Sequence, residues 1–170
     1  ASFIGAIENW IGRSLPEDFH AARSIEDQRA MRDGVDAVEG AVKFVLSLPA
    51  DLPKAIASSS TTAWIARHLE HIGLREVFGE RIFSGKEHVT RGKPAPDIYL
   101  HAAKALGIDI ARAVIVEDSP VGATGAVASG AHVIGFVGAT HCGPDHAAKL
   151  RSIGVDAVAE DFDQIAALVA

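Results

Sequence analysis

Apolar residues recur along the first 35 positions at spacings of three and four, which is typical of amphipathic helices. The residues that show this pattern before Gly12 are Phe3, Ile7, Trp10 and Ile11. Residues 14–17 have the form of a capping box, in which Ser14 accepts from a backbone amide and Glu17 reaches back. We therefore predict a second helix from this box towards Arg32, and no strand in this part of the chain.

From about residue 38 the pattern changes to short apolar runs separated by helical stretches, after a first helix at 41–48. The predicted strands are 54–57, 81–84, 113–116, 132–136 and 156–159, and the helices lie near 61–72, 95–106, 121–129, 144–153 and 162–169. Four of these helical stretches are directly followed by a glycine, as is common at helix C-termini, namely Gly73, Gly107, Gly130 and Gly154. Short, continuously apolar strands that alternate with helices predict a doubly wound α/β sandwich with a mainly parallel sheet.

Composition narrows the class of protein. The chain has 170 residues, of which 48% are apolar and 22% charged, and this excludes wholesale disorder. The balance of 16 basic and 22 acidic residues, a formal charge of −6, argues against nucleic acid as a partner. No apolar run is long enough to span a membrane, and a single cysteine allows no internal disulfide, so we expect a cytoplasmic protein.

Ligands of doubly wound sheets bind at the carboxyl ends of the strands, so the residues there are the candidates for chemistry. The first predicted strand ends in Ser58, Ser59 and Ser60, whose hydroxyls open the next helix. Hydroxyls and the amides of a helix N-terminus suit a phosphate. A plain helix cap is the alternative, because serine and threonine are common capping residues.

A basic loop follows the second predicted strand and carries Lys86, Arg91 and Lys93. Pro94 and Pro96 come next, and they stiffen the loop and start the following helix. A lysine beside such a turn is positioned to neutralise an anion. The alternative is a solvated surface lysine, which is the usual environment of this residue.

Two adjacent carboxylates, Glu117 and Asp118, follow the third predicted strand. At a buried strand end they would repel one another, and a hard cation such as Mg²⁺, which prefers oxygen ligands, would relieve that repulsion. The alternative is an acidic helix cap before Pro120. Hydroxyls, a lysine and an acid pair at three strand ends together predict a site for a phosphate and a divalent metal.

These residues also carry a family resemblance. Residues 57–60, 92–99 and 116–122 resemble motifs II, III and IV of the haloacid dehalogenase superfamily, most of all its phosphatases and phosphomutases similar to β-phosphoglucomutase, and the likeness covers about residues 1–140. The resemblance implies that Ser58 contacts the transferring phosphoryl group and that Lys93 balances its charge. It also implies that Asp118 holds Mg²⁺ directly and that Glu117 does so directly or through water.

The same resemblance implies a domain division and a missing part. Residues 1–37 resemble the end of a helical cap domain, and 38–170 resemble the α/β core without its first strand. The family's nucleophile is the first Asp of an Asp-x-Asp-Gly-Thr/Val motif on that strand, and this sequence has no such motif. The Asp-x-Asp at 161–163 is predicted to cap the last helix. We therefore expect the nucleophile on a segment upstream of Ala1.

The expected function is a Mg²⁺-dependent phosphatase of small sugar or polyol phosphates that acts through an aspartyl-phosphate. Two alternatives stay open, a sugar phosphomutase of the same fold and a non-catalytic fragment that binds phosphate or metal. The expected partner is a small phosphorylated metabolite, with no nucleic acid and no membrane, and the sequence does not indicate an oligomeric state.

A second polar cluster follows the fourth predicted strand. Its members are His141, Cys142, Asp145 and His146. A metal site or a thiol nucleophile is one interpretation, but the spacing fits no zinc pattern, and a polar loop that leads into a helix is the other. Trp10 and Trp64 lie on helical patterns and are predicted to be packing residues. The spacing of Gly122, Gly125 and Gly130 is not that of a dinucleotide-binding fingerprint.

Overall fold

The computed structural model describes Glu8 and residues 11–170, and the chain divides into two compact units, Ala1–Val35 and Asp36–Ala170. In the first unit, helix α2 spans Phe19–Asp33 and buries none of its residues. The predicted capping box at Ser14 is wrong: the carbonyl of Pro16 accepts from the Phe19 amide in a turn, and the helix begins after that turn without a side-chain cap. The helix predicted around Phe3, Ile7 and Trp10 lies outside the described residues, apart from its end.

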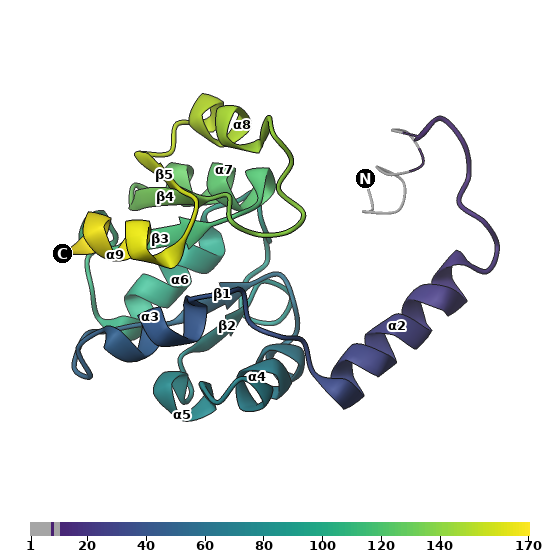
Figure 1. The fold of residues 1–170 in the computed structure, drawn as a ribbon, viewed down its shortest axis with the longest axis horizontal. Helices are drawn as coiled ribbons and strands as arrows, with labels where there is room; N and C mark the ends of the chain where they lie inside the picture. The colour runs from purple at the N-terminus through teal and green to yellow at the C-terminus, as the bar shows by residue number, and fades with distance from the viewer. Residues whose placement is uncertain (1–7, 9–10) are drawn as a thin grey trace. The chain divides into compact units, whose positions relative to one another are not determined.

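The second unit alternates strands and helices, which confirms the α/β prediction (Figure 1). The strands are β1 (Ile56–Ser58), β2 (Ile82–Ser84), β3 (Val114–Glu117), β4 (His132–Phe136) and β5 (Ala157–Ala159). The helices are α3 (Ala41–Ser47), α4 (Thr62–His71), α5 (Arg75–Phe78), α6 (Asp97–Leu106), α7 (Pro120–Ser129), α8 (His146–Ile153) and α9 (Phe162–Val169), with a 3₁₀ turn at Ile110–Arg112. None of the helices among the described residues has the length and apolar character needed to cross a membrane.

The five strands form two parallel sheets. β1 pairs with β2, so that Ser58 lies opposite Ser84, and a second sheet has the order β3-β4-β5. Within the described part of the chain, no strand pairs with the outer edges of β1 and β3. The edge position explains why Val114 and Val116 of β3 are 48% and 39% exposed, whereas the central strand β4 is buried after its first residue.

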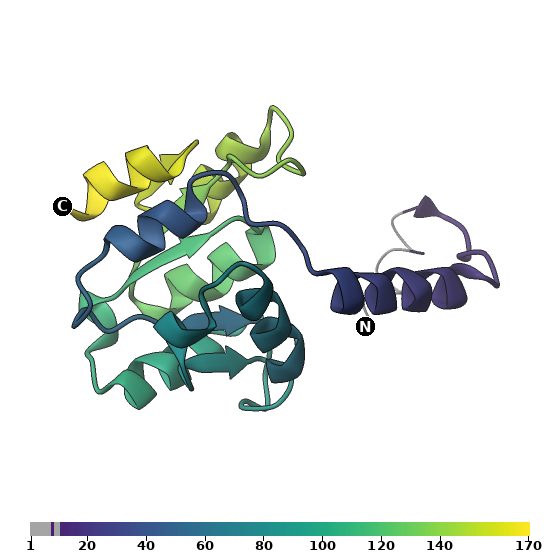
Figure 2. The same ribbon diagram turned by 60° about the horizontal axis from the view of Figure 1, so that its bottom comes forward.

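Successive strand residues face opposite helical layers, as the two-residue period of a strand requires. In β4, Val133 packs in a cluster with residues of α6 and α7, while the next residue, Ile134, packs with α9. In β2, Phe83 joins the first cluster and Ile82 packs with α4 and α5. Figure 2 shows α3 and α9 lying side by side, and both pack on the face of β4 that carries Ile134 and Phe136. The strands β2 and β4 are therefore covered on both faces, as their continuous apolar character predicted, whereas one face of β3 stays partly exposed.

The local signals at the helix ends are largely confirmed. The glycines predicted to end helices all have positive φ, namely Gly73, Gly107, Gly130 and Gly154. The Asp161 side chain accepts from the Gln164 amide at 2.7 Å and caps α9, as predicted for the Asp-x-Asp segment. The four-residue helix α5 and the 3₁₀ turn were not predicted, because such short segments show no helical periodicity.

Candidate active site

Lys93 lies where the ends of the two sheets meet. Its Nζ donates to the carbonyl oxygen of Ala57 in β1, at 3.2 Å, and forms an ion pair with Oε1 of Glu117, the last residue of β3. The side chain is only 10% exposed, so the alternative of a solvated surface lysine is wrong. An ammonium has three N–H donors, and these two contacts leave one for a ligand.

Glu117 is 8% exposed and has a second donor beside the lysine. The Tyr99 hydroxyl lies 2.6 Å from Oε1 of Glu117 and 3.0 Å from the carbonyl oxygen of Gly122. Burial, followed by the negative charge of Glu117, raises the pKa of Tyr99, so the hydroxyl stays protonated and donates. Lys93 Nζ also lies 5.0 Å from the centre of the Tyr99 ring. We call Lys93, Tyr99 and Glu117 the lysine bridge.

Two glycines of α7 allow this packing. A Cβ at Gly122 would overlap the Glu117 carboxylate, so only glycine leaves room for that side chain. A Cβ at Gly125 would lie 2.9 Å from the carbonyl oxygen of Ala95, which crowds the loop that carries Lys93. The two glycines therefore leave the space that the Glu117 side chain and the loop carrying Lys93 occupy.

Asp118 has a different environment although it is the next residue. Its side chain is 45% exposed, and Oδ2 lies 3.4 Å from Nε2 of His141. Its backbone carbonyl lies 2.5 Å from Nε2 of His146. The alternative of an acidic cap is not observed, because Ser119 caps α7 by accepting from the Gly122 amide. Of the two adjacent carboxylates, Asp118 is the one open to a ligand.

Ser58 closes β1, and its hydroxyl accepts from the Ser60 amide at 3.1 Å. Ser59 is exposed, and Ser58 and Ser60 are partly buried. The cap of α4 is Thr61, which accepts from the Trp64 amide, so none of the three serines is the cap of this helix. A Ser58 hydroxyl that accepts from an amide still has its own proton to donate.

Other charged groups near the strand ends hold the loops. Arg91 forms a two-fold ion pair with Asp97, with N–O distances of 2.9 and 2.8 Å, and this joins the loop to the start of α6. The hydrogen bonds with Asp97 raise the pKa of Arg91. Glu87 accepts from both the amide and the hydroxyl of Thr62, at 2.9 and 2.5 Å. Lys86 is exposed.

Three of the four polar residues predicted as a cluster after β4 lie close together. His141, Cys142 and His146 each offer one ligand atom, and these atoms lie within 4.8 Å of one another, whereas Asp145 is not a member of the group. We call these three residues the histidine loop. Burial raises the pKa of the Cys142 thiol, which disfavours a thiolate nucleophile. Trp64 packs edge-on against His68, whereas Trp10 lies outside the described residues.

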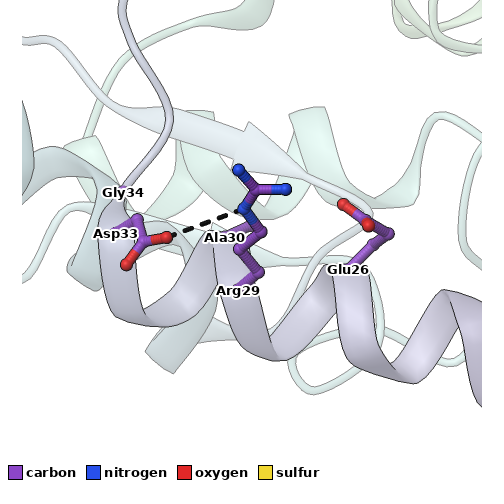
Figure 3. A pocket seen from close by; sticks show the side chains of 5 residues that line it. All are labelled: Glu26, Arg29, Ala30, Asp33 and Gly34. Atoms are coloured by element: carbon purple, nitrogen blue, oxygen red, sulfur yellow. Dashed lines mark ion pairs between the residues drawn. The ribbon is translucent and has the colours of Figure 1, made fainter.

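A shallow hollow of about 310 Å³ lies on α2 and is shown in Figure 3. It is lined by Glu26, Arg29, Ala30, Asp33 and Gly34, and Arg29 lies 3.8 Å from Asp33. None of the predicted site residues lines it. The chemistry that the sequence indicated lies at the strand ends of the second unit instead.

The structure thus brings Lys93 and Glu117 into direct contact and places Asp118 next to them in the chain. Tyr99, Gly122 and Gly125 were not predicted as part of the site. The sequence did contain signals for them. Tyr99 lies within the segment that resembles motif III, and the three-residue spacing of Gly122 and Gly125 puts both glycines on one face of α7.

Comparison with known proteins identifies the family of this chain. The family model of haloacid dehalogenase-like hydrolases matches residues 2–130. The chain is 36% identical over 103 residues to hexitol phosphatase A of Escherichia coli, covering 60% of this chain and 46% of that protein. It is 26% identical over 141 residues to 6-phosphogluconate phosphatase of the same organism, covering 83% and 62%.

A solved structure matches along the whole chain. A HAD family hydrolase from Deinococcus radiodurans, with bound phosphate and sodium, superimposes with a TM-score of 0.83 at 33% identity, covering 100% of this chain and 76% of that one. The chain spans about half the length of the curated relatives it matches. With most of its length matched by the family model and its fold by the solved structure, the chain belongs to the haloacid dehalogenase-like hydrolases.

Proposed function

We propose that the protein is a Mg²⁺-dependent phosphoric monoester hydrolase that acts on small sugar or polyol phosphates. The observation that carries the proposal is the buried Lys93, held between the ends of β1 and β3 with one N–H donor left for an anion. The names of two relatives, hexitol phosphatase A and 6-phosphogluconate phosphatase, support the substrate class. Phosphatases of this family generally use a divalent metal.

The donor set fits such a metal. Asp118 offers an exposed carboxylate, and carboxylate oxygens are the ligands that Mg²⁺ prefers. Oε1 of Glu117 is engaged by Lys93 and Tyr99, and Oε2 lies 3.3 Å from the Ser119 hydroxyl. Asp118 would therefore hold the ion directly and Glu117 through water or through Oε2. When bound, the ion offsets the charge of a carboxylate and a phosphate that approach each other.

The chain's own residues bind and orient the phosphoryl group. The third donor of Lys93 meets a phosphoryl oxygen, while Glu117 and the Ala57 carbonyl keep the ammonium in place. The Ser58 hydroxyl donates to a second oxygen, and Ser59 and Ser60 surround the group. Such fixed donors are most of what phosphoryl transfer requires of a protein. Because Tyr99 stays protonated, it keeps Glu117 in position throughout the reaction.

The remaining parts of the protein follow the family pattern. Residues 1–37 belong to a helical cap, and 38–170 form a core whose first strand, with the nucleophilic aspartate, lies between β1 and β3. The free edges of these two strands in the described residues support this placement. The aspartate attacks phosphorus as the P–O bond of the ester breaks and the sugar or polyol leaves as its protonated alcohol, and water then hydrolyses the aspartyl-phosphate to the carboxylate and inorganic phosphate.

The test is phosphate release by the full-length protein that carries these residues. A panel of hexitol, sugar and sugar-acid phosphates is assayed with Mg²⁺ and with a chelator. We expect Mg²⁺-dependent release that falls at least about 100-fold in Lys93→Met, because a fixed cation is lost from the phosphoryl group. Lys104→Met removes an exposed lysine of α6 and should leave the rate unchanged.

Three results would contradict the proposal. Rearrangement of the esters without phosphate release would indicate a mutase. Binding of phosphate without turnover would indicate a non-catalytic protein. Equal rates in the two lysine variants would remove Lys93 from the site.

A further inference from the structure

We propose that the histidine loop is a second metal site, which binds a thiophilic divalent cation such as Zn²⁺ through His141, Cys142 and His146. The site is distinct from the oxygen site proposed at Asp118 and Glu117, because its donors are two imidazole nitrogens and one sulfur. Mg²⁺ takes oxygen ligands, whereas zinc is bound in proteins by cysteine and histidine. The donor chemistry therefore assigns different ions to the two sites.

The spacing of the donors is close to that of a coordination shell. Tetrahedral zinc, with Zn–N near 2.0–2.1 Å and Zn–S near 2.3 Å, separates its ligand atoms by about 3.3–3.6 Å. Nε2 of His141 already lies 3.7 Å from Sγ of Cys142. All three donors lie within 4.8 Å of one another, so a closure of about 1 Å would complete the shell.

The backbone holds the three donors on one side of a short loop. The Cys142 amide donates to the carbonyl of Ala139 at 2.9 Å, and the His146 amide donates to that of Gly143 at 3.0 Å. These two successive turns bring His146, the first residue of α8, back towards the adjacent pair His141 and Cys142. The three ligand atoms meet only after both turns have folded the loop back. Their spacing in the sequence therefore matches no common zinc motif.

The hydrogen bond of His146 favours the tautomer that a metal ligand needs. Its Nε2 lies 2.5 Å from the carbonyl oxygen of Asp118, and since a carbonyl only accepts, Nε2 carries the hydrogen. In the neutral ring Nδ1 then keeps its lone pair. Metal-binding histidines commonly donate their other ring nitrogen to a carbonyl or a carboxylate in this way, which fixes the tautomer and the orientation of the ring.

Asp118 borders the histidine loop and is not one of its three donors. Oδ2 of Asp118 lies 3.4 Å from Nε2 of His141, at the edge of the group. The Asp118 carboxylate stays assigned to the oxygen site, so water would supply the fourth ligand of a tetrahedral zinc here. Of the three donor residues, His141 is exposed and the other two are partly buried, so an ion can reach the site from solvent.

The test is spectroscopic and needs no turnover, so its outcome is separate from that of the phosphatase assay. The full-length protein is titrated with Co²⁺, and the absorption of the thiolate-to-cobalt charge transfer is followed. Because Cys142 is the only cysteine in these 170 residues, a band that is lost in Cys142→Ser reports this site. We expect one Co²⁺ bound with this band, and displacement by Zn²⁺ but not by Mg²⁺.

The matched variants exchange one histidine at a time. His141→Gln and His146→Gln should each weaken Co²⁺ binding at least about 10-fold, since loss even of an outer-shell partner costs that much. His132→Gln removes an exposed histidine at the opposite end of β4 and should bind as the wild type does. His141 is 57% exposed, so its variant is expected to fold, and circular dichroism checks this.

Two results would overturn the proposal. One is a wild-type protein without the charge-transfer band at saturating Co²⁺. The other is a band whose strength and affinity are the same in His141→Gln as in His132→Gln.

Discussion

Asp118 follows Glu117 of the lysine bridge in the chain and lies 3.4 Å from His141 of the histidine loop. These two regions differ in how far their polar groups are already paired. In the lysine bridge the ammonium, the phenol and the carboxylate contact one another away from solvent. In the histidine loop two imidazoles and a thiol converge with few contacts between them, next to solvent. In the first region the charged groups are already paired and only one N–H of Lys93 is left for a ligand, whereas in the second region three ligand atoms converge.

The two adjacent carboxylates show what this difference means. Glu117 is 8% exposed and Asp118 is 45% exposed, although both follow the same strand. A buried carboxylate has to be paired, so Glu117 positions Lys93. An exposed carboxylate keeps its oxygens for a ligand. Burial, and not residue type, therefore separates the positioning acid from the binding acid.

The largest expected effect comes from breaking the lysine bridge. Lys93→Met should lower the free energy of unfolding by about 3–5 kcal/mol, because Glu117 is left as a buried charge without its cation. Urea denaturation measures the loss, and Lys104→Met on the exposed face of α6 is the control. Equal stability of the two variants would show that the ion pair does not hold the strand ends together.

Tyr99→Phe removes one donor and leaves the ion pair. We expect a loss of about 1.5–3 kcal/mol at neutral pH, the range for a hydrogen bond to a charged group. The folded state raises the pKa of Tyr99, so this contribution is fully present below the unfolded pKa near 10 and is lost as the pH rises beyond it.

The stability difference between wild type and Tyr99→Phe should therefore shrink in alkali. Tyr99 is the only tyrosine in these residues, so the absorbance of tyrosinate also reports it directly. Ionisation at the pH of free tyrosine in the folded protein would contradict the buried hydrogen bond.

Gly122→Ala tests the space that the lysine bridge needs. The added Cβ overlaps the Glu117 carboxylate, so we expect a loss of about 1–3 kcal/mol, typical of overpacking. Gly143→Ala is the matched control, since a Cβ there meets nothing within 4 Å. Thermal unfolding of the two variants compares them, and an unchanged melting temperature in Gly122→Ala would contradict the tight approach.

Much of the fold could be predicted, because alternating short strands and helices leave a clear period in the sequence. The strand ends also identified Ser58, Lys93 and the acid pair as candidates. The sequence could not show that Glu117 is buried and Asp118 exposed, because that depends on α6 supplying Tyr99 and α7 leaving space at Gly122. The helix was predicted to start at Ser14, but α2 begins only at Phe19 because a turn closed by the Pro16 carbonyl precedes it.

An exposed carboxylate outside both regions gives the smallest expected effect. Hydrogen bonds with Thr62 lower the pKa of Glu87, so its contribution to stability is present above the unfolded pKa of about 4.3 and is lost as the pH falls through the folded value. The stability difference between wild type and Glu87→Gln should therefore disappear in acid. Glu70→Gln, on the exposed side of α4, is the control. A difference that grows in acid would contradict the assignment.

The most direct test of the contrast between the two carboxylates is a Mg²⁺ titration of phosphate release by the full-length protein and its Asp118→Asn variant. We expect the wild type to saturate with Mg²⁺, and the variant to fold but to lose at least about 100-fold of the rate, because the exposed acid holds the cation that stabilises the reacting charge. An Asp118→Asn variant with the rate and the Mg²⁺ dependence of the wild type would contradict it.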